Sequence, residues 1–495
     1  MQTLFLNPIY GIKNDKYCSF IYTINDSFDI LISRPPEVVE IPSLYGYILS
    51  HFQDPTNPAD TILQISKKTG LQEKLLLNFI CKITNNRTSL KQKAGEYSFI
   101  LPPQLLIEVK ENEKKRAKIF TEKDFNPFQK YVSSRPSSPA AVTIMLTSKC
   151  HTDCIYCYAD REKRVDFSLE RILYLIEDCY QTGVFKVTLS GGDIFAYKEW
   201  KLVFEKMHMC GYNSFISTKI PLKEEDLIFL INNGINELQF SLDSANSKDI
   251  NNIIKRDDIY LKETEKMFML CHQYGIKINI KTVLTKYNAK VETLNLLYNF
   301  LLMANIHSWN IVPAFFSSYR EGYDNYQADE VALQDCDEYL RKIASENKLI
   351  ISYRKLEQDN NSNIKYNTVN DFLKHNKGCL STSHNLSINV FGQVTVCEML
   401  YNLSKFHLGN ANKKTIKELW NSDIIKDFFN FRFTSIKKNI KSPCYKCTSY
   451  NQCKIGNTKK VCLVDIINTY GEDRWDYPDP RCPHAPKCDM NLLIK

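Results

Sequence analysis

Residues 150–158, CHTDCIYCY, carry three cysteines in the spacing CxxxCxxC, at Cys150, Cys154 and Cys157. They come directly after the apolar run AVTIML, residues 141–146, which predicts a β-strand. A loop at the carboxyl end of a strand in an α/β sheet is a common place for an active site. Three thiolates at this spacing can hold three corners of a cubic iron–sulfur cluster, whose usual complement is four cysteines. One iron would then stay open to another ligand.

Zinc is the main alternative at this loop. A structural zinc site normally completes its tetrahedron with a fourth Cys or His at short spacing. His151 is adjacent to Cys150 and lies too close in sequence to share its metal comfortably. Cysteines that fall together by chance are the remaining alternative. We therefore favour an iron–sulfur cluster.

Short apolar runs alternate with helical segments from residue 141 to residue 320. The segment FSLERILYLIEDCYQTG, for example, places Phe167, Ile172 and Leu175 on one helical face. Such alternation predicts the α/β class, with a parallel sheet covered by helices, and six strands predict a partial (β/α)6 TIM-like barrel. The six predicted strands are AVTIML, FKVTLS, NSFIST, ELQFSLD, KINIKTVLT and WNIVPAF.

The region before this barrel divides into a small domain and a linker. Residues 1–90 contain two predicted strands over 19–33 and then helical patterns, the last over 72–84, which together predict a small strand and helix domain. A simple N-terminal extension that packs on the rest is the alternative. Residues 91–140 are charged and end in SSRPSSPA, which predicts a linker.

The region after the barrel is first polar and then rich in cysteine. Residues 321–375 include the low-complexity run EQDNNSNIKYN and predict a partly helical connecting region with a domain junction. Residues 376–495 hold most of the remaining cysteines and predict a metal-binding domain.

Composition limits the classes of function. Seventeen cysteines among 495 residues, without an export signal in MQTLFLNPIYGIKNDKYC, indicate metal binding or catalysis in a soluble, cytoplasmic protein with no membrane partner. The formal charge of +8 is modest and spread along the chain, so we expect no nucleic acid partner. Six cysteines stand alone in mostly apolar surroundings and are predicted to be buried: Cys18, Cys81, Cys179, Cys210, Cys271 and Cys336.

The cysteine loop resembles that of the radical S-adenosylmethionine (SAM) superfamily. Tyr156 stands before the last cysteine, where the family has an aromatic residue near the adenine. Gly191, Gly192 and Asp193 follow the second predicted strand and are similar to the family's GGE motif, with Asp in place of Glu. The resemblance implies that these residues bind SAM together with Ser190, Ser217, Thr218, Ser241, Asp243 and, as the cationic partner of the carboxylate, Arg256.

The resemblance also implies the chemistry. In this superfamily the open iron of a 4Fe-4S cluster binds SAM, and reduction yields a 5′-deoxyadenosyl radical that removes a hydrogen atom from the substrate. Cys150, Cys154 and Cys157 would then be the catalytic cluster ligands. A reduced flavodoxin or ferredoxin-type protein is the implied electron donor.

The second cysteine group resembles the SPASM domain, which carries auxiliary iron–sulfur clusters in peptide-modifying radical enzymes. The resemblance implies one auxiliary 4Fe-4S cluster on Cys444, Cys447, Cys453 and Cys482, and another on Cys379, Cys397 and Cys462. The latter lacks a fourth ligand unless Cys488 supplies it, and its open iron could otherwise bind a substrate thiolate. The family has a further cysteine where this chain has Asn457. CxxC pairs alone also suit a zinc ribbon.

The N-terminal pattern resembles the winged-helix recognition element of maturases that act on ribosomally made peptides. In that family a leader peptide adds as a strand beside the wing and the third helix, which here would involve residues 19–24 and 72–84. The combination implies a precursor peptide with a leader as partner, and a thioether or carbon crosslink as product. A sulfatase-type maturase that forms formylglycine and a zinc-containing winged-helix DNA-binding regulator are the alternatives.

Overall fold

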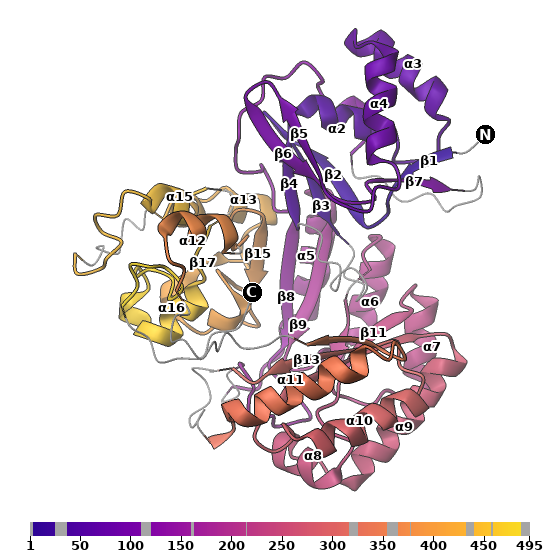
Figure 1. Cartoon of the computed structure of the whole chain (residues 1–495), viewed down its shortest axis with the longest axis vertical. Coiled ribbons are helices and arrows are strands. Elements are labelled where there is room, and N and C mark those ends of the chain that lie inside the picture. Colours follow the sequence, from indigo (N-terminus) through magenta and orange to yellow (C-terminus); the bar gives the residue numbers. More distant parts are fainter. Residues whose placement is uncertain are drawn as a thin grey trace. The chain divides into compact units, whose positions relative to one another are not determined.

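A computed structural model describes residues 3–24, 37–109, 120–159, 163–213, 215–315, 325–353, 365–376, 378–431, 440–456 and 459–486. The chain forms two compact units (Figure 1). The smaller unit comprises Met1–Ala140 and Tyr180–Lys186, and the larger comprises Ala141–Cys179 and Val187–Lys495. No helix in the described part of the chain is long and apolar enough to cross a bilayer.

Parallel strands form the centre of the larger unit. All six predicted strands are present: β8 (Ala141–Thr147), β9 (Lys186–Gly191), β10 (Ser217–Thr218), β11 (Glu237–Ser241), β12 (Lys277–Leu284) and β13 (Ser308–Pro313). Among the described residues they belong to two five-stranded sheets, ordered β17-β16-β15-β8-β9 and β10-β11-β12-β13-β14. The break falls between β9 and β10, and β10 is only two residues long.

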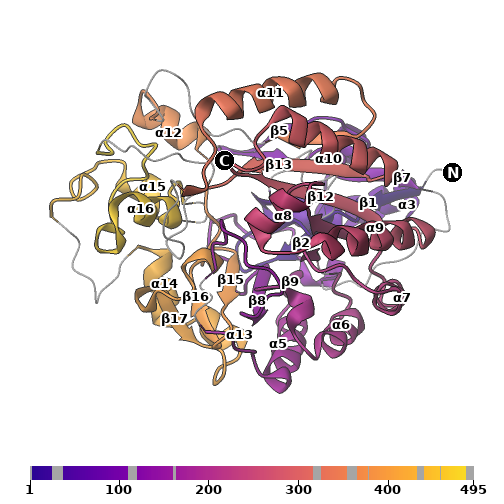
Figure 2. The ribbon, with the colours of Figure 1, turned by 90° about the horizontal axis from the view of Figure 1, so that it is seen from below.

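Helices cover the outer side of these strands, as Figure 2 shows for α5, α6, α7, α9, α10 and α11. Each has an apolar stripe: α5, for example, buries Ile172, Leu175, Ile176 and Cys179. This arrangement agrees with the predicted α/β class. The helices between the strands are α5 (Leu169–Gln181), α6 (Trp200–Met209), α7 (Glu224–Asn232), α8 (Ser247–Ile254), α9 (Asp258–Gln273) and α10 (Val291–Met303).

The predicted connecting region, residues 321–375, contributes to this fold. Helix α11 (Glu330–Ala344) buries Leu333, Cys336, Leu340 and Ile343, and β14 (Ile350–Tyr353) pairs in parallel with β13. One more helix and strand therefore extend the sheet beyond the six strands that the apolar runs predict. The polar outer face of α11 hides this unit from a search for apolar segments.

The cysteine-rich region also joins the sheet, because β15 (Asn385–Ile388) pairs in parallel with β8. It continues antiparallel into β16 (Gln393–Thr395) and β17 (His407–Asn410). Short helices make up most of the rest: α12 (Val369–His375), α13 (Ile416–Trp420), α14 (Asp423–Phe429), α15 (Tyr450–Lys454) and α16 (Leu463–Tyr470).

Among its described residues, the smaller unit contains an antiparallel sheet in the order β2-β3-β4 and three α-helices. Its elements are β2 (Tyr10–Asn14), β3 (Ser19–Thr23), β4 (Val38–Ile41), α2 (Ser43–Ser50), α3 (Pro58–Thr69) and α4 (Glu73–Ile83). The second strand predicted over 19–33 lies outside the described residues. The structure also corrects the docking strand: β3 is paired on both sides, so residues 19–24 have no free edge for a peptide.

Residues 91–140 are not a simple linker. They contain most of the hairpin β5 (Leu90–Ala94) and β6 (Tyr97–Leu101), and β7 (Leu106–Val109), which pairs with β1 (Thr3–Leu6). Phe99, Leu101 and Leu106 lie in the core of the unit. In β5 polar residues alternate along an exposed face, which gives the segment its linker-like composition.

The isolated cysteines are buried as predicted, with one exception. Cys18, Cys179, Cys210, Cys271 and Cys336 are buried, but Cys81 is exposed. Helix α4 turns Leu76, Ile80 and Ile83 inward, so the residue after Ile80 falls on the outer face.

Candidate active site

The cysteine loop after β8 is held by the end of a helix. The last carbonyl groups of an α-helix have no partner within the helix. In α8 the carbonyls of Ile253 and Ile254 accept the main-chain N–H groups of Ile155 and Asp153, each at 3.0 Å. The loop therefore has a fixed main-chain support that no side-chain motif reveals.

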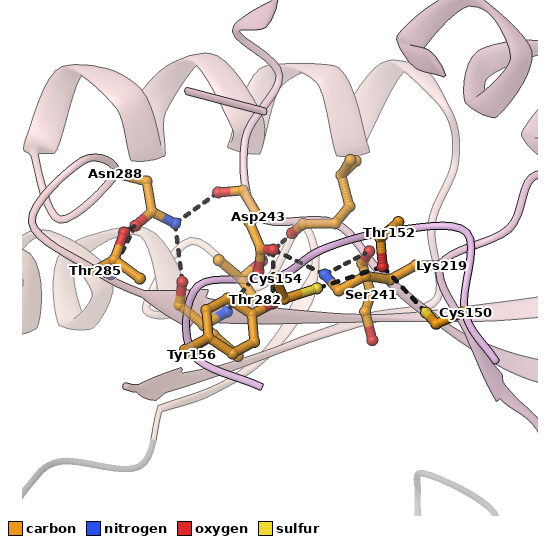
Figure 3. A network of polar contacts seen from close by, with 12 residues as sticks. Cys150, Thr152, Cys154, Tyr156, Lys219, Ser241, Asp243, Thr282, Thr285 and Asn288 are labelled. Atoms are coloured by element: carbon orange, nitrogen blue, oxygen red, sulfur yellow. Dashed lines mark hydrogen bonds and ion pairs between the residues drawn. The ribbon is translucent and has the colours of Figure 1, made fainter. Parts of the chain in front are cut away.

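A threonine lies between two of the thiols. The hydroxyl of Thr152 is 3.3 Å from Sγ of Cys150 and 3.4 Å from Sγ of Cys154 (Figure 3). The main-chain N–H of Cys157 bonds to the carbonyl of Cys154 at 3.1 Å. Burial raises the pKa of the Cys154 thiol to about 12, and the nearby Lys219 opposes this rise.

The glycine pair is needed by the backbone that leads into the loop. Gly191 has φ of 147°, and a Cβ there would overlap the carbonyl oxygen of Thr147. A Cβ on Gly192 would overlap the carbonyl oxygen of Lys149. The N–H of Gly192 instead bonds to the Thr147 carbonyl at 2.7 Å. The glycines thus bring the end of β9 against the residues just before Cys150.

Asp193 joins two strand ends. Its carboxylate accepts hydrogen bonds from the Thr218 hydroxyl at 2.8 Å and from the main-chain N–H groups of Lys219 and Phe195 at 3.0 and 3.1 Å. Burial raises its pKa, and these hydrogen bonds oppose the rise. The side chain that takes the place of the family's Glu is therefore occupied in linking β9 to β10.

A buried ion pair lies beside the cysteine loop (Figure 3). Nζ of Lys219 is 2.7 Å from the Asp243 carboxylate and 3.3 Å from the carbonyl of Ser241. The Tyr156 hydroxyl donates to the same carboxylate at 2.7 Å, and the ammonium group lies 5.6 Å from the centre of its ring. Burial acts to lower the pKa of Lys219, but Asp243 and the thiols of Cys154 and Cys150 raise it above its usual value.

Sequence reasoning missed Lys219 and chose Arg256 as the cation. The Arg256 guanidinium lies 5.9 Å from the centre of the Tyr260 ring and is not part of the Lys219 and Asp243 ion pair. Lys219 follows the Ser217 and Thr218 pair at the end of β10, and its position there is the signal that could have found it.

Of the predicted serine and aspartate contacts, Asp243 is the most constrained. Its side chain is fully buried, and it also accepts the main-chain N–H of Val283 at 3.0 Å. The amide of Asn288 holds the Asp243 carbonyl at 2.7 Å. Ser217 lies apart from this network, since its hydroxyl accepts the side-chain amide of Gln239.

Glu398 connects the cysteine-rich region to this site. It follows Cys397, and its carboxylate accepts hydrogen bonds from the hydroxyl of Tyr158, at 2.7 Å, and from that of Ser190. Tyr158 follows Cys157, and Ser190 precedes the glycine pair. Burial raises the pKa of the Glu398 carboxyl group. The sequence gives no local sign of this contact, because it joins residues more than 200 positions apart.

Four cysteines of the second group line one cavity, as the predicted assignment requires: Cys444, Cys447, Cys453 and Cys482. Val369 and Phe372 of α12 form part of its wall. Burial raises the pKa of the Cys453 thiol to about 12 and that of Cys482 to about 11. Four thiols around one enclosed space are the donor set that a 4Fe-4S cluster needs.

The other set is also brought together. Burial raises the pKa of the Cys397 thiol, and the neighbouring Cys379 and Cys462 raise it further. Cys488 lies outside the described residues. The described residues contain no group of three or more His, Cys, Asp or Glu side chains placed to hold a single metal ion.

Asp479 links the two sets of cysteines. One carboxylate oxygen accepts the main-chain N–H of Cys462 at 2.9 Å, and the other accepts both the main-chain N–H and the guanidinium of Arg481. Its carbonyl accepts the N–H of Cys482 at 2.8 Å. Arg481, itself buried, is also paired with Asp465 at 2.8 Å.

Two family models match the chain. The model of the radical SAM superfamily matches residues 144–297, and the model of SPASM, an iron-sulfur cluster-binding domain, matches residues 379–448. The first match includes the cysteine loop and the Lys219 and Asp243 pair. The second includes Cys379, Cys397, Cys444 and Cys447.

Curated relatives match a third or less of the chain. A GTP 3′,8-cyclase of Clostridium perfringens is 28% identical over 171 residues, which is 31% of this chain and 49% of the relative. A probable GTP 3′,8-cyclase of Methanothermobacter marburgensis is 28% identical over 120 residues, 24% of this chain and 39% of the relative. The chain thus spans half or less of the length of these relatives.

Solved structures of SuiB from Streptococcus suis match the chain along its whole length. The structure bound to the precursor peptide SuiA has a TM-score of 0.60 and 16% identity, and the alignment covers 99% of this chain and 100% of that one. The structure bound to S-adenosylmethionine has a TM-score of 0.59 and 15% identity, with 96% and 98% covered. At this identity the likeness shows a shared fold.

Proposed function

Because the chain is an enzyme of the radical SAM superfamily with a SPASM domain, we propose that it modifies side chains of a ribosomally made peptide. The observation that carries the proposal is the fold likeness along the whole of both chains to SuiB, a protein solved with its precursor peptide. This likeness extends over the smaller unit. A radical enzyme that acts on a small molecule would have no evident use for such a unit.

The superfamily assignment defines the cofactors. The radical SAM domain uses a 4Fe-4S cluster with SAM, and the SPASM domain holds auxiliary iron–sulfur clusters. Cys150, Cys154 and Cys157 would hold the first of these. When bound, the cluster and SAM supply the 5′-deoxyadenosyl radical that removes a hydrogen atom from the substrate.

The residues around the loop would bind and orient SAM. We assign the SAM carboxylate to Lys219 in place of Arg256, because the Lys219 ammonium is buried beside the thiols. Asp243 would position both Lys219 and the Tyr156 ring. We still expect the Tyr156 ring to lie beside the adenine of SAM. Ser190 and the main chain of Gly191 and Gly192 would remain the contacts to the methionine end.

The smaller unit would bind the leader of the peptide. An added strand needs an unpaired edge, which in the sheet β2-β3-β4 belongs to β2 or β4. The leader would therefore lie beside one of these strands rather than beside β3. Main-chain hydrogen bonds would supply this contact.

Two alternatives carry less support. A zinc-containing DNA-binding regulator is not supported, because the chain matches an enzyme superfamily and an iron–sulfur cluster-binding domain. The sulfatase-type maturase shares the catalytic core but leaves the smaller unit without a purpose, so it is not favoured.

The test is to search the neighbouring reading frames for a short precursor peptide and to use any such peptide as the substrate. Anaerobically purified enzyme is mixed with reductant, SAM and that peptide, and the products are analysed by mass spectrometry. We expect 5′-deoxyadenosine together with a peptide that has lost two hydrogens and whose fragmentation shows two residues joined by a thioether or carbon crosslink. A formylglycine product, or an unmodified peptide despite SAM cleavage, would refute the proposal.

A further inference from the structure

Lys454 is a buried cation at the four-cysteine cavity. It is the last residue of α15 and only 1% exposed. Its Nζ donates to the carbonyls of Asp476 and Tyr477 at 2.6 and 2.8 Å. A lysine so deeply buried is rare, because removing an ammonium group from water is costly unless an opposite charge compensates it.

The described residues provide no carboxylate that forms an ion pair with Lys454. Asp479 lines the same cavity, but its carboxylate is already bound by Arg481 and by the N–H of Cys462. Carbonyl groups and the ring of Phe431, 5.0 Å from Nζ, lie around the ammonium group. These dipoles stabilise the charge only in part.

The thiols that share the cavity with Lys454 are a further source of negative charge. Lys454 lines the cavity together with the four cysteines. Its charge opposes the burial that raises the thiol pKa of Cys444 and of Cys453. When these thiols become thiolate ligands of iron, the cavity acquires the negative charge that the ammonium group lacks.

We propose that Lys454 is a positioning residue for this auxiliary cluster: its fixed charge balances the thiolates and raises the reduction potential of the cluster. Reduction adds one electron, and a cation held close by in a medium of low dielectric constant favours the reduced state. The inference goes beyond the peptide chemistry, since it concerns the cluster whatever bond the enzyme forms.

The test measures the potential of this cluster in the full chain. Lys454→Gln removes the charge but keeps a donor for the two carbonyls, and an EPR-monitored redox titration gives the midpoint potential. We expect a shift to more negative potential. The matched control is Lys446→Gln, which removes the same charge between Cys444 and Cys447 but at an exposed position. Solvent screening should make its shift much smaller.

Each outcome decides the proposal. An unchanged potential in Lys454→Gln, or an equal shift in Lys446→Gln, would overturn it. If Lys454→Gln fails to load this cluster while the other iron is retained, Lys454→Arg provides the answer. Loading restored by Arg supports a role of the charge, whereas loss in both variants means that Lys454 acts through packing and the proposal is wrong.

Discussion

The two groups of cysteines use the same kind of ligand, a thiol, in different arrangements. One is the loop of Cys150, Cys154 and Cys157, and the other is the cavity of Cys444, Cys447, Cys453 and Cys482. The loop offers three thiols on a short segment that α8 holds through its main chain. The cavity gathers two thiols from the turn of Cys444 and Cys447, one from α15 and one from the distant Cys482. Asp479 and Arg481 support it.

Charge is also used differently in the two places. At the loop, Lys219 is paired with Asp243, and in our assignment it would also bind the carboxylate of SAM. At the cavity, Lys454 has no ion-pair partner among the described residues. Three thiols beside a cation paired with a carboxylate suit a cluster that must bind a ligand, whereas four thiols beside a cation without an ion-pair partner suit a closed cluster that exchanges electrons.

The largest effect should follow from removing a loop thiol. Cys154→Ala is expected to lower 5′-deoxyadenosine formation by more than about 100-fold, since losing a metal ligand exceeds the effect of losing its supporting contacts. Chromatography of the nucleoside product measures it. Cys271→Ala, at a buried cysteine of α9 outside both groups, is the control and should retain cleavage.

Removing a cavity thiol should separate the two regions. Cys453→Ala is expected to lose the iron of one cluster, roughly four atoms per chain, and to abolish peptide modification while 5′-deoxyadenosine still forms. Iron and sulfide analysis with a cleavage assay measures this. If cleavage were lost together with the cavity iron, the two sites would not be independent.

The ion pair at the loop should have an intermediate effect. Lys219→Met is expected to weaken SAM binding by about 10- to 100-fold, the range of a charge-assisted hydrogen bond. Equilibrium binding to the cluster-loaded enzyme measures it. Arg256→Met is the matched control, for which we expect at most about a 5-fold change, typical of a partly exposed charge. The reverse order would restore the original assignment of Arg256.

The smallest effect concerns the contact between the two regions. Tyr158→Phe removes the hydroxyl that donates to Glu398 and should lower the local stability by about 1 kcal/mol. Hydrogen exchange of peptides that contain Glu398 measures it. Tyr174→Phe, at an exposed ring on α5, is the control. Equal exchange in both variants would mean that the Glu398 contact contributes nothing.

The sequence predicts the features that are local. Apolar runs locate all six core strands, and cysteine spacing locates the loop, because period and spacing are encoded within a few residues. The four cysteines of the cavity are grouped by the resemblance to the SPASM domain. The strands β5 and β6 escape notice because β5 alternates polar residues and resembles a linker. The exposure of Cys81, which has both apolar and polar sequence neighbours, can be predicted only once the buried face of its helix is known.

The features that the sequence hides depend on distant contacts. Lys219, Glu398 and Lys454 each directly follow a predicted site residue, but each gains its importance from a partner that only folding brings close. The prediction of the docking strand is wrong for the same reason. Residues 19–24 have a strand pattern, but the sequence does not show that β4 pairs with this strand and covers its edge.

The most direct test of the account is whether SAM acts at one cluster and not at the others. EPR spectra of the reduced chain are recorded with and without SAM for the wild type, Cys154→Ala and Cys453→Ala. The account predicts a SAM-dependent change of the cluster signal in the wild type and in Cys453→Ala, and none in Cys154→Ala. A change that persists in Cys154→Ala, or that disappears in Cys453→Ala, would contradict it.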